Sequence, residues 1–249
     1  MTRPFLTAAA LALSVAAPAQ ALDIASMNET EREAFRAEIR DYLLENPEVI
    51  FEAVAVMEAR QAEAQAQDDV QLVSDNADGL FNDPDSWVGG NPEGDITLVE
   101  FLDYRCGYCR KAFEDVEQLV ETDGNIRFII KEFPILGEQS VTGSRFAIAA
   151  KQVAGDEAYK AVHDALMTFN GDFTETGLRR MAETLGLDAD AIIGQMDSPE
   201  VDEVIAANHA LGQRMGISGT PSFVMGDQML RGYVPLEGMR QIAEQIRAE

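Results

Sequence analysis

The sequence predicts an α/β domain that carries an inserted helical block and follows a separate helical segment. Three observations lead to this prediction. Apolar strand-like runs at 96–102 and 126–130 flank a helical pattern. The stretch from about 140 to 216 has helical spacing throughout. Two further short apolar runs and a last helical pattern close the chain.

Residues 1–21 have the pattern of an export signal. Arg3 precedes an apolar run from Phe5 to Ala17, and Ala19-Gln20-Ala21 has the small residues of a cleavage site. A membrane anchor is the alternative, but the run is short for a span and ends in a proline. We therefore expect an exported chain that begins near Leu22, with a bacterial periplasm as its compartment.

Composition limits the possible partners. The chain has 44 acidic and 19 basic side chains, a formal net charge of −25. Nucleic acids and anionic membranes attract basic surfaces, so we expect no nucleic-acid partner. His163 and His209 lie in helical patterns with polar neighbours and are expected to be surface or structural residues. We expect no bound cofactor and no metal site.

The N-terminal part of the exported chain predicts two helices. Asn28 can cap the first, and Asn46-Pro47 suits the start of the second. Each carries a narrow apolar stripe between polar flanks. One interpretation is a hairpin packed on its own domain; we favour association between copies of the chain. Residues 22–67, and 28–67 within them, are thus assigned to homo-oligomerisation, and the Asp-, Asn-, Gly- and Pro-rich stretch 68–95 to a linker. The apolar residues Leu80, Phe81, Trp87 and Val88 are expected to hold this linker against the domain that follows.

Residues 96–249 are expected to form the main domain. Its first strand is almost wholly apolar and therefore predicted to be buried. A helix at 111–121 and the strand at 126–130 complete a βαβ unit. Glycines and Ser198-Pro199 divide the helical block at about 140–216 into short helices. The predicted closing elements are strands at 222–225 and 229–233 and a helix from about Leu236.

Cys106-Gly107-Tyr108-Cys109 is the motif that points to chemistry. These are the only two cysteines in the chain, and thiols at this spacing can close a disulfide and open it again. A helix N-terminus at Cys106 would stabilise its thiolate, so Cys106 is the candidate nucleophile. Cys109, more buried in the first turn, would resolve a mixed disulfide. A structural disulfide or half a zinc site are the alternatives, although zinc needs about four ligands.

Three stretches in this order resemble the DsbA-like branch of the thioredoxin superfamily: Val99–Cys109, Glu132–Gly137 and Gly219–Phe223. The resemblance covers roughly residues 80–249. It implies a thioredoxin fold with an inserted helical block and protein thiol–disulfide oxidoreductase activity. Residues 28–67 resemble the N-terminal stalk of ScsC-like suppressor-of-copper-sensitivity proteins, which trimerise and act as disulfide isomerases.

The resemblance also implies roles for further residues. Thr220-Pro221 matches the pair that faces the active site, with a cis proline that exposes the Thr220 backbone to a substrate chain; an ordinary trans proline is the alternative. Glu100, six residues before Cys106, matches a buried acid and would accept the proton of Cys109. The alternative is a glutamate that faces an edge. Gly107 and Tyr108 lie between the cysteines and belong to the expected site.

Tyr108 separates this chain from the strongly oxidising members of that branch, which carry histidine there. A tyrosine adds no positive charge, so we expect a less oxidising pair that serves as isomerase or reductase. A DsbA-type oxidase stays the alternative, and a protein that binds copper through reduced Cys106 and Cys109 is the alternative of another class. The expected partners are unfolded or misoxidised secreted proteins and an unidentified membrane redox partner.

Overall fold

The computed structural model describes residues 26–248, so the expected export signal lies outside the described residues. The chain divides into two compact units, one ending at Ala59 and one beginning at Arg60, and each is described by itself. The boundary falls inside helix α2 (Glu48–Asp75). Among the described helices, none combines the length and the apolar character that a membrane crossing requires.

The first unit holds helix α1 (Glu29–Glu45) and the beginning of α2, as the sequence predicts. Asn28 and Glu31 form a capping box, in which each side chain accepts a hydrogen bond from the backbone N–H of the other. Within the described part of the chain, α1 buries none of its residues. Large apolar side chains of this unit are therefore exposed: Phe35, Ile39, Tyr42, Leu44, Ile50, Phe51, Val54, Val56 and Met57.

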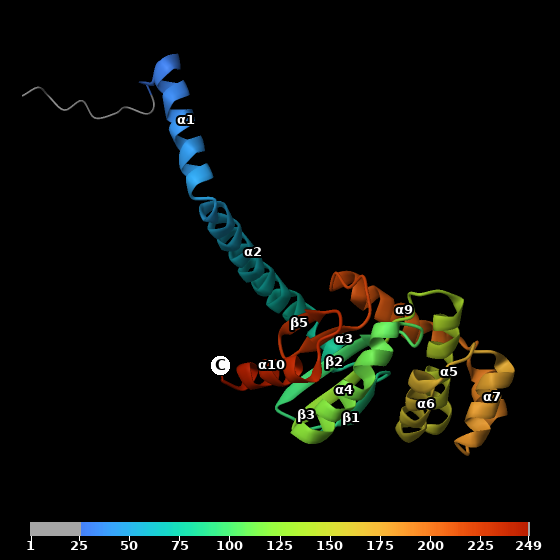
Figure 1. The fold of residues 1–249 in the computed structure, drawn as a ribbon. Helices are drawn as coiled ribbons and strands as arrows, with labels where there is room; N and C mark the ends of the chain where they lie inside the picture. Colours follow the sequence, from blue (N-terminus) through green and yellow to red (C-terminus); the bar gives the residue numbers. More distant parts are fainter. Residues whose placement is uncertain (1–25, 249) are drawn as a thin grey trace, which may run out of the picture. The chain divides into compact units, whose positions relative to one another are not determined.

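The second unit is built on a five-stranded sheet with the strand order β1-β3-β2-β4-β5 (Figure 1). The two central neighbours β2 and β3 run parallel, and the other pairs are antiparallel. The strands are β1 (Trp87–Gly90), β2 (Ile96–Leu102), β3 (Ile126–Glu132), β4 (Ser222–Met225) and β5 (Gln228–Arg231).

Seven helices besides α2 and α3 (Ala77–Phe81) complete this unit. Helix α4 connects the parallel strands, five helices between β3 and β4 form the predicted helical block, and α10 closes the chain (Figure 1). Their bounds are α4 (Gly107–Asp123), α5 (Glu138–Ala154), α6 (Asp156–Thr168), α7 (Glu175–Thr184), α8 (Ala189–Gln195), α9 (Pro199–Arg214) and α10 (Leu236–Ala248).

Strand β2 separates two apolar clusters because successive side chains of a strand point to opposite faces. Leu98 and Leu102 belong to the cluster that includes α4, α10 and much of the helical block. Val99 and Phe101 belong to a smaller cluster with residues of α3 and α9. Both faces of β2 are therefore covered, which explains its nearly continuous apolar sequence.

The stretch 68–95 differs from the expected linker. Helix α2 continues through Asp75, α3 follows, and β1 joins the sheet beside β3. Asp69 is buried and forms an ion pair with Arg231 at 2.6 Å, and Trp87 is buried in the main cluster. Leu80 is buried in the smaller cluster, and Phe81 and Val88 pack against it, so the expected contact of these apolar residues with the domain is confirmed. The regular structure of the stretch was not expected from its turn-forming composition. Several bounds also differ from the predicted ones: α4 is 107–123 where 111–121 was expected, β3 extends to Glu132, and the last strand is 228–231 where 229–233 was expected.

Candidate redox-active site

The two cysteines lie where β2 ends and α4 begins, as the sequence predicts. Cys106 is the N-cap of α4, and its backbone N–H donates to the Asp103 carbonyl at 3.0 Å. Cys109 lies one turn into the helix with no exposed surface, whereas Cys106 keeps 7% exposure. Both are free thiols. Their unequal exposure fits the expected division between an attacking and a resolving thiol.

The surroundings of Cys106 favour its thiolate. Its pKa is lowered to about 5, chiefly by a hydrogen bond from the Cys109 side chain. The side chain of Thr220 and the backbone N–H groups of Cys109 and Tyr108 act in the same direction, against the cost of partial burial. These amides belong to the first turn of α4, which leaves them without intrahelical acceptors. The helix start thus supplies a nucleophile at neutral pH.

Cys109 and Glu100 have the opposite environment. Burial raises the pKa of Cys109 well above its usual range, with the Cys106 hydrogen bond and the Glu100 charge as further causes. Glu100 lies on the central strand β2, between β3 and β4, so the alternative of an edge-facing glutamate is wrong. It is 3% exposed, and its Oε1 has no hydrogen-bond partner among the described residues. A buried carboxyl with a free oxygen can accept a proton.

Burial raises the pKa of Glu100 to about 8. Negative charges nearby act in the same direction: Glu117, Cys106 and Glu132. A protonated Glu100 is therefore the main form at neutral pH while Cys106 is a thiolate. A thiol with a lowered pKa and a nearby buried carboxyl with a raised pKa are typical of an acid–base site.

The loop before β4 faces the nucleophile. The Thr220–Pro221 peptide bond is cis, as expected from the resemblance. The Cys106 thiol donates a hydrogen bond to the Thr220 carbonyl at 3.1 Å, and Gly232 N–H donates to the Pro221 carbonyl at 3.0 Å. A cavity of about 220 Å³ lies along this loop, lined by residues 216–222 with Arg231 and Gly232. The chain thus brings Cys106, Thr220 and Pro221 together from positions more than a hundred residues apart.

Asp103 ties this turn to the loop after β3, a role that the sequence analysis missed. It is fully buried, and one carboxylate oxygen accepts from the N–H groups of Ile135 and Leu136 at 2.8 and 3.0 Å. The other accepts from Arg105 N–H at 2.8 Å. An acid directly after an apolar strand was the available signal, but its partners follow from the fold.

Apolar side chains stand exposed at this turn and at the loop that Asp103 holds. Tyr108 is 63% exposed, and Leu136 and Ile135 are 55% and 36% exposed. Gly107 is exposed too, with no atom within 4 Å of the place where a Cβ would stand. A thiolate beside exposed apolar side chains and a bare glycine can receive a polypeptide segment.

Glu132, at the end of β3, is a second buried acid that the sequence analysis did not single out. It is 2% exposed and accepts hydrogen bonds from the hydroxyls of Tyr104, Tyr159 and Ser144. Burial raises its pKa to about 7. The three hydroxyl donors come from distant segments of the chain, so spacing could not reveal them.

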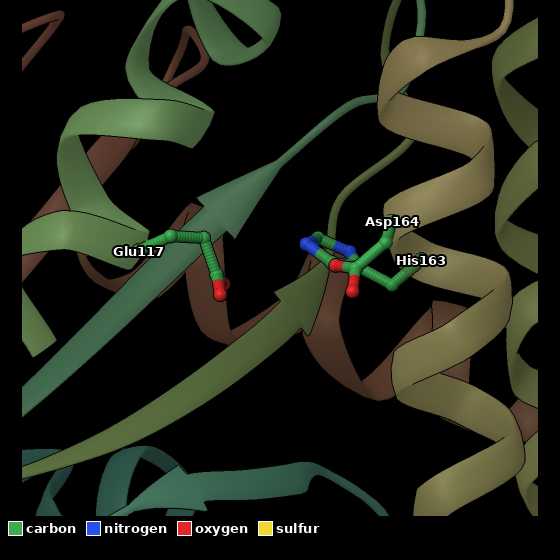
Figure 2. Close-up of side chains that lie close together, drawn as sticks. All are labelled: Glu117, His163 and Asp164. Carbon is green, nitrogen blue, oxygen red and sulfur yellow. The ribbon is translucent and has the colours of Figure 1, made fainter. Parts of the chain in front are cut away.

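One side-chain cluster has donor atoms suited to a metal ion. Glu117 on α4 and His163 and Asp164 on α6 bring ligand atoms within 4.8 Å of one another, and Figure 2 draws them facing across the gap between the two helices. Lys160, however, donates to Glu117 at 3.0 Å and to Asp164 at 2.7 Å. Its ammonium group already compensates these carboxylates. His163 is buried with Nδ1 3.2 Å from the Tyr104 hydroxyl, a structural histidine as the sequence analysis allowed.

Two family models match this chain. The DSBA-like thioredoxin domain matches residues 97–244, and the N-terminal domain of the copper resistance protein ScsC matches residues 31–64. The first covers more than half of the chain and includes both cysteines, Glu100 and Thr220-Pro221. The second coincides with the segment expected to mediate oligomerisation.

Individual proteins agree with the first model. A thioredoxin-like oxidoreductase from Silicibacter pomeroyi is 45% identical and covers 69% of this chain and 98% of its own, with a TM-score of 0.65. ScsC from Proteus mirabilis in a transitional conformation is 26% identical over 90% of this chain and 98% of its own, with a TM-score of 0.65. The Na(+)/H(+) antiporter NhaA 1 of Salinispora arenicola is 29% identical over 63% of this chain, but the matched part spans only 24% of the antiporter.

The fold and the thiol geometry agree with these similarities. A parallel β2–α4–β3 unit carries the Cys-Gly-Tyr-Cys motif at the helix start, and a cis proline faces it. In the sequence, a helical block lies between β3 and β4, while in space β4 pairs with β2 in one sheet. The chain therefore belongs to the DSBA-like thioredoxin-domain family of thiol–disulfide oxidoreductases.

Proposed function

We propose that this protein is a periplasmic disulfide isomerase or reductase that acts on unfolded or misoxidised secreted proteins. The observation that carries the direction is Tyr108 between the cysteines. An exposed tyrosine adds no cation beside the Cys106 thiolate, so the reduced pair gains less stability than with a histidine there. The exposed apolar side chains Tyr108, Leu136 and Ile135 support an unfolded polypeptide as the substrate.

The proposed reaction begins with attack of the Cys106 thiolate on a substrate disulfide. A new S–S bond joins Cys106 to one substrate sulfur, and the other leaves as a thiolate. In isomerisation, another substrate thiolate attacks the substrate sulfur of this mixed disulfide and restores Cys106. In reduction, Cys109 loses its proton to Glu100 in the fraction of molecules where that carboxyl is ionised, a minor fraction at neutral pH. Cys109 then attacks the Cys106 sulfur, which releases the substrate thiolate and leaves a Cys106–Cys109 disulfide. A membrane redox partner would then return the pair to its thiols.

Oligomerisation through residues 28–67 is part of this proposal. The exposed apolar side chains of α1 and of the first turns of α2 support it, as does the ScsC N-terminal model over 31–64. Association would hold several thiol pairs close to one substrate, which raises their effective concentration for repeated exchange.

Cys106→Ala tests the central claim. The variant is expected to lose all unscrambling of a wrongly oxidised substrate, because the nucleophile is gone. Cys109→Ala is the matched variant: it keeps the nucleophile, so isomerisation persists while net reduction of the substrate stops. If Cys106→Ala still unscrambles the substrate, the proposed function is wrong.

A deletion tests the oligomer. Removing residues 22–59 leaves the second unit complete, including Asp69, which pairs with Arg231. We expect a smaller mass in light scattering, loss of isomerisation and retained reduction of a small disulfide. An unchanged ratio of solution mass to chain mass would refute association through residues 28–59, the part of the segment that the deletion removes.

The two alternatives have their own discriminating measurements. A reduction potential of the Cys106–Cys109 pair close to that of strong oxidants, about −120 mV, would favour an oxidase. The name of the ScsC model, a copper resistance protein, gives a reason to test copper binding through the two free thiols. Stoichiometric Cu(I) recovered with the reduced protein, and lost in Cys106→Ala, would favour a copper carrier.

A further inference from the structure

Glu132 is held by hydroxyl groups from three separate elements. The hydroxyls of Tyr104, after β2, and of Tyr159, on α6, both donate to its Oε1 at 2.6 Å. Ser144, on α5, donates to Oε2 at 2.7 Å. Hydrogen bonds this short to a carboxylate are charge-assisted and stronger than neutral ones. The site is therefore built to hold a buried carboxylate in one orientation.

The nearest ionisable neighbours supply no compensating cation. Burial lowers the pKa of His163 to about 3, so its ring is neutral; it meets the Tyr104 hydroxyl at 3.2 Å. Because Tyr104 donates to Glu132, the His163 Nδ1–H is the donor to Tyr104. Lys131, the neighbour of Glu132 on β3, donates instead to Asp83 at 2.6 Å. The carboxyl of Glu132 thus depends on hydroxyl donors.

Glu132 is close to the redox site through its partner Tyr104 and through its place in the sheet. Tyr104 is two residues before Cys106, within the turn that places the thiol at the start of α4. In the parallel ladder, Glu100 pairs with Ile130 and Leu102 with Glu132. Glu132 therefore lies on the same face of the sheet as Glu100, one strand across and two residues along. Strand spacing and rise place their backbones about 8 Å apart.

We propose that Glu132 is a positioning residue of the redox site, which holds Tyr104 beneath the active-site turn and sets a second carboxyl beside Glu100. The inference rests on the proposed role of Glu100 as proton acceptor of Cys109. When Glu132 carries its negative charge, a second charge on Glu100 is disfavoured, and Glu100 keeps its proton to higher pH. Glu132 thereby affects the pH at which the resolving step becomes available.

Several other groups act on these two acids and must be kept constant in a test. The charges and dipoles that face Glu132 or Glu100 from the surrounding elements belong to Asp103, Tyr104, Cys106, Cys109, Glu117, Ser144, Tyr159 and His163. Exchange of one carboxyl for an amide leaves all of them in place.

Glu132→Gln tests the charge, with Glu121→Gln as the matched control at an exposed position of α4. The reduced protein is titrated while the infrared band of protonated carboxyl groups is followed, and Glu100→Gln identifies the contribution of Glu100. In Glu132→Gln, Glu100 is expected to release its proton about 1 to 1.5 pH units lower. This shift takes the backbone separation of about 8 Å as the distance between the two carboxyl groups, at an effective dielectric constant of about 20. Glu121→Gln is expected to leave the titration unchanged.

An unchanged Glu100 titration in Glu132→Gln, or an equal change in Glu121→Gln, overturns the proposal. Because the carboxyl groups are observed directly, this result is independent of whether the chain exchanges disulfides. Tyr104→Phe decides the positioning role and serves if Glu132→Gln does not fold. It is expected to slow alkylation of Cys106 several-fold at a pH near 6, with Glu100 still titrating at raised pH. Alkylation at the rate of the unmodified protein would refute positioning through Tyr104.

Discussion

The buried acid Glu100 leads to a prediction about stability as well as reactivity. In the folded, reduced protein its pKa is about 8, against a usual value of 4.5. Between these values the unfolded chain releases the proton while the folded protein retains it. The contribution of Glu100 to folding stability is thus complete below 4.5, falls as the pH rises and is gone above 8. Replacing it by glutamine should remove this pH dependence.

The size of the effect follows from the displacement of the pKa. One pH unit corresponds to about 1.4 kcal/mol. The raised pKa of Glu100 therefore lowers the free energy of unfolding by about 1 kcal/mol at about pH 5 and by about 4 kcal/mol at about pH 8. Glu100→Gln is therefore expected to stabilise the protein by these amounts. The gain is realised because the Glu100 Oε1 has no hydrogen-bond partner among the described residues, so the exchange breaks no bond at that oxygen.

Urea unfolding of the reduced protein at the two pH values measures this difference. Glu114→Gln, at an exposed position of the same helix that carries Cys109, is the control and should change the free energy of unfolding by less than about 0.5 kcal/mol. A gain for Glu100→Gln that is equal at both pH values, or a loss at the higher one, would refute the argument that Glu100 is buried and protonated.

Two further predictions concern the surroundings of the thiols. Tyr108→His should make the pair more oxidising by about 20 mV, the equivalent of about 1 kcal/mol of added thiolate stabilisation, measured by equilibration with glutathione at a pH where the imidazole is charged; an unchanged or more reducing potential would contradict the role given to Tyr108. Asp103→Ala removes the acceptor of three hydrogen bonds donated by backbone N–H groups and should lower the free energy of unfolding by about 3 kcal/mol, whereas Asp68→Ala on the exposed face of α2 should leave it nearly unchanged. Equal unfolding midpoints for these two aspartate variants would show that the hydrogen bonds of Asp103 do not stabilise the fold.

Much of the site was predictable from local pattern. The cysteine spacing, the apolar strand before it and the helical pattern after it place Cys106 at a helix start. These three patterns involve only residues that are close together in the chain. The order of elements from 96 onward followed in the same way, because hydrophobic period distinguishes strand from helix. The stretch 68–95 was predicted less well. Its turn-forming composition is compatible with a linker, and its apolar residues Leu80, Phe81, Trp87 and Val88 predicted contact with the domain. The helices, the edge strand and the polar partners of Asp69 and Trp87 depend on distant residues and were not predicted.

The sequence by itself determined that this protein has a reactive thiol pair on an α/β domain behind a helical segment. Those features depend on residues that are neighbours in the chain. The resemblance implied the buried acid Glu100, but only the tertiary structure decided which further acids and hydroxyls surround that pair. Asp103 finds the backbone of 135–136, and Glu132 gathers hydroxyls from three elements, because the ends of β2 and β3 lie side by side under the helical block. Burial by these distant segments raises the pKa values of Glu100 and Glu132.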